Sequence, residues 1–367
     1  MKKLRSGYTT GACAAAAAKA ATLLLVSGTR QVSVEIPFPD GSRVRFSLVH
    51  SDFVDSEKSI ATAAVIKDAG DDPDVTNGAR IEASVCCGKK DRARSELFRI
   101  LGGVGVGSVT KRGLAVPVGE PAINPVPRQM IRAAVAEALI EGNEKKDCCL
   151  DITISIPQGE ELAKKTLNHR LGIVGGLSVL GTTGIVRPIS ADAWTATVAT
   201  SMDVARAAGL TEVILSTGRT SERAVQEHLG LAEEAQVMMG DYLHFSLVEA
   251  ARHNFQRIHL AAMWAKVMKG AMRIPQTHVR NGVLEVKAAL EFLAGLGCSS
   301  ELLLTLKGSN TAREIYGRLV EQGEGQVILR VCEAARDYCQ EVSGIEVIVY
   351  LVDASSTIVA MTDGEGC

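Results

Sequence analysis

Residues 4–21 read LRSGYTTGACAAAAAKAA, a polar, glycine-containing segment that runs directly into a tract of alanines. Alanine loses no side-chain entropy in a helix, so the tract predicts a helix, and Thr9 and Thr10 stand where an N-cap belongs. Side chains this small let another backbone or a flat ligand approach closely. The first N–H groups of the helix would face a carboxylate or phosphate, although a tightly packed structural helix explains the same residues.

The length and composition predict a globular protein of two domains. The chain has 367 residues, 46% of them hydrophobic but only 4% aromatic, with 35 glycines. These values favour small-residue packing and many tight turns over an aromatic-lined pocket. The net charge of −2 argues against a general nucleic-acid binder, because affinity for phosphates needs a basic surplus.

The nine cysteines show neither a disulfide framework nor a C-x-x-C pair, so we expect no structural zinc site and no protein-bound metal. Reduced thiols fit a cytoplasmic protein. Lys2, Lys3 and Arg5 before an apolar run resemble a signal peptide, but Ser6 to Thr10 and Lys19 interrupt that run. With no uncharged run long enough to span a membrane, we expect no membrane partner; a homo-oligomer is compatible with the sequence.

The first half has the pattern of an α+β domain with a mostly antiparallel sheet. Alternating residues predict a hairpin from 31–36 and 43–48, and further strands at 80–85 and 151–156. Helices are expected at 56–67 and 127–141.

After Pro188 strands alternate with helices, which predicts a Rossmann-like α/β domain with a parallel sheet. Strands are expected at 210–216, 235–239, 257–263 and 346–352, and helices after residue 217 and at 241–254, 311–322 and 326–342. The domains are therefore expected at 1–190 and 191–367.

Several stretches have the residue types of a ligand site. Residues 67–74 place four carboxylates in one loop, which suits a cationic group, a ribose diol or a proton, although solvated loop acids are the usual reason for such a cluster. Residues 102–107 are glycine-rich but do not fit G-x-G-x-x-G, which favours close backbone approach over dinucleotide binding. Residues 157–188 combine glycines, threonines and cations, a composition that suits the cradling of a polyanion.

Five ordered motifs together resemble the CbiD family, the cobalt-precorrin-5B C(1)-methyltransferases of anaerobic cobalamin biosynthesis. They are GYTTGACAAAAAKAA (7–21), KDAGDDPDVTNGA (67–79), GVGVGSVTKRGL (103–114), PAINPVPRQMI (121–131) and KTLNHRLGIVGGLSVLGTTGIVRP (165–188). The chain departs from the family at 262–266, where only Lys266 of a G-H-x-G-K stretch is kept, while Thr277 and His278 match the family's T-H pair.

The resemblance implies S-adenosylmethionine as methyl donor and a small-molecule cobalt tetrapyrrole as acceptor, with the cobalt carried by the substrate. Methyl transfer to ring carbon C1 would give cobalt-precorrin-6A. This methyl transfer is an in-line displacement. It requires that donor and acceptor are aligned and that water is excluded, and it needs no covalent enzyme intermediate.

The candidate site residues follow from the motifs. Asp71 and Asp72 are the candidate catalytic acids, for contact with the donor's ribose or sulfonium or for taking up a proton. The candidate substrate- and cofactor-binding residues are Thr9, Thr10, Gly11, Lys111, Arg128, Lys165, Arg170, Gly181, Thr182, Thr183, Gly184, Gly218, Arg219, Lys266 and His278. Gly218 and Arg219 lie at a strand-to-helix junction, where parallel sheets bind ligands.

Two other functions stay open on the sequence alone. A non-enzymatic carrier of a cobalt tetrapyrrole would show no response to S-adenosylmethionine. A nicotinamide-dependent reductase, suggested by the glycine run and the β-α half, would be protected by NADPH, but the chain lacks the dinucleotide fingerprint.

Overall fold

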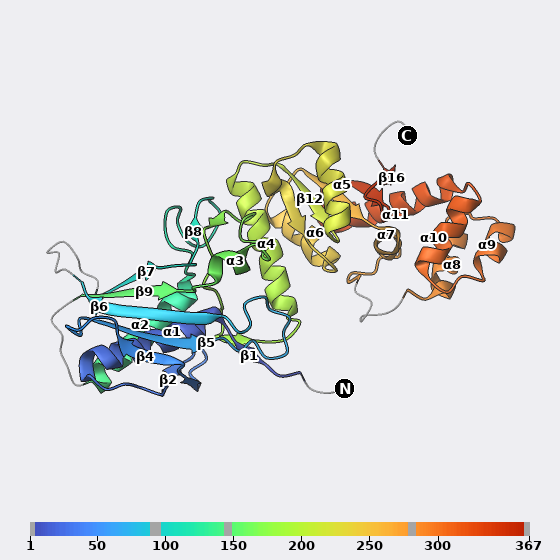
Figure 1. The fold of residues 1–367 in the computed structure, drawn as a ribbon. Coiled ribbons are helices and arrows are strands. Elements are labelled where there is room, and N and C mark those ends of the chain that lie inside the picture. Colours follow the sequence, from blue (N-terminus) through green and yellow to red (C-terminus); the bar gives the residue numbers. More distant parts are fainter. Residues whose placement is uncertain (1–3, 89–96, 143–148, 278–283, 363–367) are drawn as a thin grey trace. The chain divides into compact units, whose positions relative to one another are not determined.

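The computed structural model describes residues 4–88, 97–142, 149–277 and 284–362. The chain divides into two compact units, unit 1 over residues 1–190 and unit 2 over residues 191–367. Figure 1 shows the elements of each unit, coloured along the sequence from blue to red.

Unit 1 combines three helices with short and long strands. Its helices are α1 (Thr10–Ser27), α2 (Pro125–Glu141) and α3 (Gly159–Ala163). Its strands are β1 (Gly7–Tyr8), β2 (Ser33–Pro37), β3 (Arg43–Ser47), β4 (His50–Phe53), β5 (Ile60–Ile66), β6 (Arg80–Cys87), β7 (Phe98–Gly102), β8 (Ser108–Val109), β9 (Leu150–Ser155), β10 (Ile173–Val174) and β11 (Ile185–Val186).

The main sheet of unit 1 has the order β4-β5-β6-β9-β7. The pairings β4–β5, β5–β6 and β6–β9 are antiparallel, and β7 joins β9 in parallel. Three two-stranded pairs, β1–β11, β2–β3 and β8–β10, bring distant segments of the unit together. The hairpin predicted from 31–48 is confirmed as β2 and β3.

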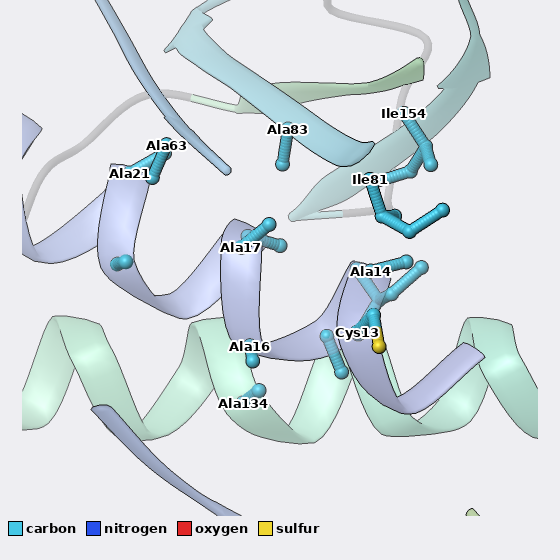
Figure 2. Packing of buried hydrophobic residues seen from close by; sticks show 14 of the residues in the cluster. Cys13, Ala14, Ala16, Ala17, Ala21, Ala63, Ile81, Ala83, Ala134 and Ile154 are labelled. Carbon is cyan, nitrogen blue, oxygen red and sulfur yellow. The ribbon is translucent and has the colours of Figure 1, made fainter. Parts of the chain in front are cut away.

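Helix α1 is the centre of unit 1, and every residue from Thr10 to Val26 is buried. It packs between α2 and strands β5 and β6, with Ala16 facing Ala134 of α2 and Ala17 turned towards the sheet (Figure 2). A helix buried on all sides needs apolar residues all round, and alanine lets both layers approach closely. Although α1 is long and apolar enough to cross a membrane, 94% of it is buried inside the fold.

The predicted helix at 56–67 is wrong, because β5 occupies residues 60–66. Its alternate residues Ala61 and Ala63 are fully buried beneath α1. Antiparallel pairing with β4 and β6 provides the backbone partners of this segment, and this tertiary context outweighs the local helix preference of its alanines. The predicted helix at 127–141 is confirmed, but it begins earlier, at Pro125.

Unit 2 is built from strands and longer helices. Its helices are α4 (Ala191–Ala207), α5 (Arg219–Leu229), the short 3-10 helix η1 (Glu233–Ala235), α6 (Leu243–Arg252), α7 (Trp264–Ala271), α8 (Val286–Gly295), α9 (Ser300–Leu306), α10 (Ala312–Glu321) and α11 (Gly325–Ser343). Its strands are β12 (Glu212–Ser216), β13 (Gln236–Met238), β14 (Arg257–Ala262), β15 (Glu346–Val352) and β16 (Ile358–Met361).

The sheet of unit 2 has the order β13-β12-β14-β15-β16, with β16 antiparallel and the other four strands parallel. Helix α5 packs on one face, where Ala224 and Val225 join Ile214 of β12. Helices α4, α6, α7 and α11 cover the other face. The four parallel strands were predicted, whereas the edge strand β16 was not.

Candidate functional site

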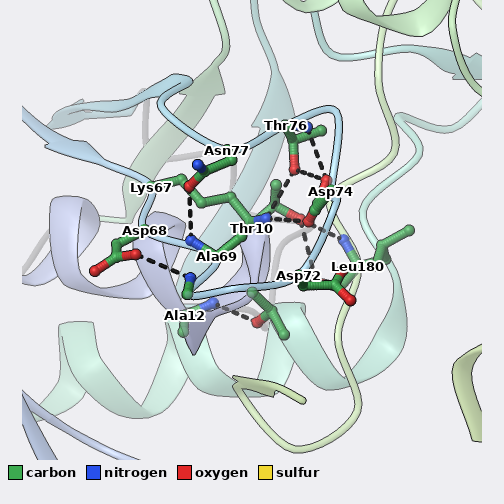
Figure 3. A network of polar contacts seen from close by, with 12 residues as sticks. Thr10, Ala12, Lys67, Asp68, Ala69, Asp72, Asp74, Thr76, Asn77 and Leu180 are labelled. Carbon is green, nitrogen blue, oxygen red and sulfur yellow. Dashed lines mark hydrogen bonds and ion pairs between the residues drawn. The ribbon is translucent and has the colours of Figure 1, made fainter. Parts of the chain in front are cut away.

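The chain itself closes the first turn of α1. Thr9 is the N-cap, and its Oγ1 accepts the N–H of Ala12 at 3.2 Å. The Leu180 carbonyl accepts the Gly11 N–H at 3.1 Å and the Thr10 hydroxyl at 3.1 Å, and the Leu180 N–H donates back to Thr10 Oγ1 (Figure 3). A ligand carboxylate can therefore reach these groups only by displacing the Leu180 loop, residues 177–184.

Glycines allow this loop to lie against α1. Gly181 has φ +132°, and a Cβ there would lie 2.5 Å from the side chain of Thr9. Gly184 has φ +83°, and a Cβ there would lie 2.7 Å from the Phe38 ring. The Thr183 hydroxyl bonds within the loop to the backbone of Ile185, while Thr182 is exposed. The loop therefore surrounds the start of α1 and leaves Thr182 facing solvent.

The acidic loop, residues 67–79, ties two other segments to the start of α1. The Asp68 carboxylate accepts hydrogen bonds from Arg5 Nη1 and Nη2 at 2.6 and 2.8 Å, and this hydrogen bonding lowers the pKa of Asp68 to about 2. Asp71 accepts the backbone N–H of Arg5 at 2.6 Å, and Asp72 accepts that of Ile189 at 2.9 Å. The predicted catalytic pair therefore lies beside residues 5 and 189, in the same neighbourhood as Thr9 and Leu180.

Lys67 anchors the acidic loop from inside. Its side chain is buried, pairs with Asp74 and donates to Thr76 Oγ1 at 2.8 Å (Figure 3). Burial alone would raise the pKa of Asp74, but the Lys67 charge and the hydrogen bonds from Lys67 and Thr76 outweigh it and lower that pKa. The acids of this loop were predicted as site residues, but Lys67 was not. Its one signal in the sequence is its position directly before the first of these acids.

The candidate cations of unit 1 fall at separate places. Lys111 Nζ donates to the Arg170 carbonyl at 3.1 Å, so these two residues meet. Lys165 is exposed on the turn after α3. Arg128 holds the turn before α2, donating to the Ile123 carbonyl at 2.8 Å.

The glycine run 102–107 packs against backbone. Gly105 has φ +71°, and a Cβ there would lie 1.9 Å from the Ile156 carbonyl oxygen. The Leu177 N–H donates to Gly105 O, and the Gly107 N–H donates to Leu177 O. Close approach of another segment explains these glycines, as expected. Within the ranges that the structure describes, no group of three or more His, Cys, Asp or Glu side chains is placed to hold a metal ion.

The candidate residues of unit 2 lie at the carboxyl edge of its sheet, formed by the loops after β12, β13 and β14. Gly218 and Arg219 follow β12, and Lys266 lies in the first turn of α7, which follows β14. These loops are joined by backbone hydrogen bonds, since Ser216 O accepts the N–H groups of Met239 and Gly240, and Ala261 O accepts that of Thr217. His278 lies outside the described residues.

Lys266 belongs to a polar cluster at this edge. It pairs with Asp241 and donates to the Thr277 carbonyl at 2.9 Å, and Thr277 Oγ1 donates to Asp241 Oδ1 at 3.0 Å. Lys269 also donates to the Thr277 carbonyl, and burial together with the Lys266 charge lowers its pKa. Asp241 was not predicted as a site residue, although it stands only two residues after the predicted parallel strand 235–239.

Comparison with known proteins gives consistent matches. Residues 1–188 match the CbiD family model, and residues 276–363 match the model of the CbiD C-terminal domain. A curated cobalt-precorrin-5B C(1)-methyltransferase of Desulfotalea psychrophila is 55% identical over 98% of each chain. Two further proteins of the same name are each 47% identical to this chain. The match to the protein of Geobacter sulfurreducens covers 97% of this chain and 98% of the relative. The match to the protein of Geotalea daltonii covers 91% of this chain and 92% of the relative.

A solved structure also matches. It is the 1.9 Å crystal structure of a cobalamin biosynthesis protein (cbiD) from Archaeoglobus fulgidus, 26% identical, covering 87% of this chain and 85% of that one, with a TM-score of 0.38.

Proposed function

Because this chain belongs to the CbiD family, we propose that it acts in cobalamin biosynthesis as a cobalt-precorrin-5B C(1)-methyltransferase, giving cobalt-precorrin-6A. It is an enzyme, and its substrate is a tetrapyrrole. The observation that carries this conclusion is the 55% identity, over 98% of each chain, with a curated relative of that name.

The methyl donor we propose is S-adenosylmethionine. When bound, it supplies an electrophilic methyl group, and the bonding electron pair stays on sulfur as the methyl group passes to ring carbon C1. The chain's task is to hold the two reactants in line and to exclude water. Two features at the carboxyl edge of unit 2 suit a donor of this kind: the open space in front of Gly218 and the buried hydroxyl of Ser216.

Unit 1 is proposed to bind the tetrapyrrole. The macrocycle is flat and fringed with carboxylates, so it needs dispersed cations rather than one deep charge. Lys111 and Arg170, which meet, and the exposed Lys165 supply such charges near the glycine-rich segments. Asp71 and Asp72 are proposed to take up a proton, while Thr9, Thr10, Gly11 and the loop 181–184 are proposed to line the same part of unit 1.

Unit 2 is proposed to be a Rossmann-like domain. The order β13-β12-β14-β15 is that of a doubly wound sheet. The chain passes from β12 to β13 on one side and then crosses back to β14 on the other side of β12. A cytoplasmic location is proposed too, because the apolar helix α1 is a core element of unit 1.

The experiment that tests the function is an anaerobic incubation of the full chain with cobalt-precorrin-5B and methyl-labelled S-adenosylmethionine, followed by mass spectrometry. We expect a gain of one labelled methyl group, located at C1, together with one S-adenosylhomocysteine per turnover. Tetrapyrrole that is bound but unmodified, with no S-adenosylhomocysteine formed, would contradict the proposal and favour a carrier.

A further inference from the structure

The carboxyl edge of unit 2 holds a buried hydroxyl that lacks a hydrogen-bond partner. Ser216, the last residue of β12, is fully buried, and its Oγ has no partner among the described residues. A buried polar group in this state costs free energy unless something else supplies the bond. The hydroxyl is therefore the first sign that a group absent from the chain belongs here.

Strand geometry directs this hydroxyl towards α5. Side chains two residues apart on a strand lie on the same face. Ile214 packs with Ala224 and Val225 of α5, so Ser216 lies on that face as well. Because α5 begins three residues after β12 ends, Ser216 stands close to the start of this helix in the chain, on the face that the helix covers.

The start of α5 is formed by glycine. Gly218 is the N-cap residue, and among the described residues the helix has no side-chain capping hydrogen bond there. An α-helix leaves these groups without intrahelical partners and concentrates positive potential there. An anionic group is the natural partner for such a helix start.

Glycine at position 218 is not required by the chain's own structure. Its φ of 176° and ψ of 170° are extended backbone that any residue adopts. A Cβ at this position would meet no atom of the described part of the chain within 4 Å. The space in front of the helix start is therefore open, and a bound group can approach the backbone there.

This point is also where the sheet's connections diverge. β12 is flanked by β13 on one side and β14 on the other, with α5 on one face and α6 on the opposite face. Open sheets of this kind bind ligands at the carboxyl ends of the two strands where the connections diverge. Gly218 and Lys266 follow those two strands.

We propose that the carboxylate of the donor's methionine moiety binds at the start of α5, against the first-turn N–H groups and the Ser216 hydroxyl. The exposed guanidinium of Arg219 then adds a charge-assisted contact from the rim. This inference rests on the proposed function, because it gives a place to the donor of that reaction. It assigns donor binding to unit 2.

The test replaces Gly218 by aspartate in the full chain. Aspartate is a good N-cap and its charge suits a helix start, so Gly218→Asp should leave Tm unchanged or raised. The same carboxylate would occupy the proposed site, so binding of S-adenosylhomocysteine, measured by calorimetry, should weaken at least about tenfold. Gly218→Asn caps without the charge and should weaken binding less.

The matched probe is 5′-methylthioadenosine, which lacks the carboxylate. It should bind the wild-type chain and Gly218→Asp equally well. Gly317→Ala in α10, where a Cβ also meets nothing within 4 Å, is the control and should bind both probes like wild type. Equal binding of S-adenosylhomocysteine by wild type and Gly218→Asp would overturn the inference, and so would equal loss of both probes. A wild-type chain that binds neither probe would overturn the donor assignment as well.

Ser216→Ala gives an independent measurement. Because the hydroxyl has no partner in the described structure, its removal should leave Tm unchanged or raised. The affinity for S-adenosylhomocysteine should fall several-fold, while that for 5′-methylthioadenosine stays constant. A lower Tm with unchanged affinities would show that the hydroxyl serves the fold and would overturn its assigned role.

Discussion

The four aspartates of the acidic loop look equivalent in the sequence, but the groups that they bind in the structure differ. Asp68 pairs with Arg5, Asp74 pairs with the buried Lys67, and Asp71 and Asp72 accept backbone N–H groups from Arg5 and Ile189. Pairing with a cation accounts for Asp68 and Asp74 in structural terms. We therefore propose Asp71 and Asp72, rather than Asp68 and Asp74, as the acidic residues that act in the reaction.

Asp72→Asn tests the charge of the second of these acids. Asparagine keeps an oxygen that can accept the Ile189 N–H, so we expect Tm to stay within about 2 °C of wild type. If the carboxylate takes up a proton, kcat/KM for methyl transfer should fall about 100-fold. Asp40→Asn, in the β2–β3 turn, is the control. Unchanged methyl transfer in Asp72→Asn would remove this residue from the mechanism.

The lowered pKa of Glu137 predicts how the stability of unit 1 changes at low pH. Its carboxylate is held by Arg43 and the buried Lys19, and this hydrogen bonding, led by Arg43, lowers its pKa from 4.5 to about 2. A lowered carboxyl pKa gives stability that is present above the unfolded pKa and is lost as pH falls through the folded one. Glu137→Gln should therefore destabilise the chain at pH 7 by about 1 kcal/mol after solvent screening.

The difference in free energy of unfolding between wild type and Glu137→Gln should narrow as pH falls from 4.5 to about 2. Urea unfolding at several pH values measures it. Glu57→Gln, at an exposed loop position, should change stability by less than about 0.5 kcal/mol throughout. A difference that does not depend on pH would contradict the assignment.

Helices α1 and α2 owe their close contact to small side chains. Ala16 and Ala134 face each other across the two helices, and both are fully buried (Figure 2). Protein interiors are close-packed, so the contact between α1 and α2 has no room for additional methylene groups. The alanine tract is therefore a packing requirement as well as a helix signal.

A pair of neighbouring substitutions on α2 tests this packing. Ala134→Leu should destabilise the chain by about 1–3 kcal/mol, because the larger side chain forces α1 and α2 apart. Ala133→Leu changes the adjacent, exposed residue of the same helix and should stay within about 0.5 kcal/mol of wild type. Urea unfolding compares them, and equal stability of the two variants would refute the packing argument.

Each of the two units carries some of the candidate site residues. Unit 1 contains the five family motifs, and unit 2 contains a sheet with four parallel strands, at whose carboxyl edge Gly218, Arg219 and Lys266 lie. Each unit has its own hydrophobic core. We therefore expect donor and tetrapyrrole to stabilise different units.

Tryptophan fluorescence separates the two units, because both tryptophans of the chain, Trp194 and Trp264, lie in unit 2. S-adenosylhomocysteine at 100 times its Kd should stabilise the tryptophan-monitored transition by about 2.7 kcal/mol. Circular dichroism, which reports both units, should show an unfolding step of unit 1 that the ligand moves less. Stabilisation confined to a transition that tryptophan does not report would place the donor in unit 1.

The local sequence was enough to predict several elements. The N-cap at Thr9 and the alanine tract gave α1, alternation gave β2 and β3, and the β-α pattern gave the parallel strands of unit 2. In each case the signal is contained within one element, as a capping side chain, a helix preference or a period of two. The motifs also predicted membership of the CbiD family, and the match of residues 1–188 to the family model confirms it.

Only the tertiary structure decided the contacts between segments that lie far apart in the chain. Residues 60–66 form a strand because β4 and β6 pair with them, which no local preference expresses. Leu180 meets Thr10, and Asp241 meets Lys266 and Thr277, because strand order and loop packing bring these positions together. Likewise, the Ser216 hydroxyl has no hydrogen-bond partner among the described residues because the fold buries it on the face of the sheet that α5 covers. The free energy of such contacts depends on which segments become neighbours, and the whole fold sets that arrangement.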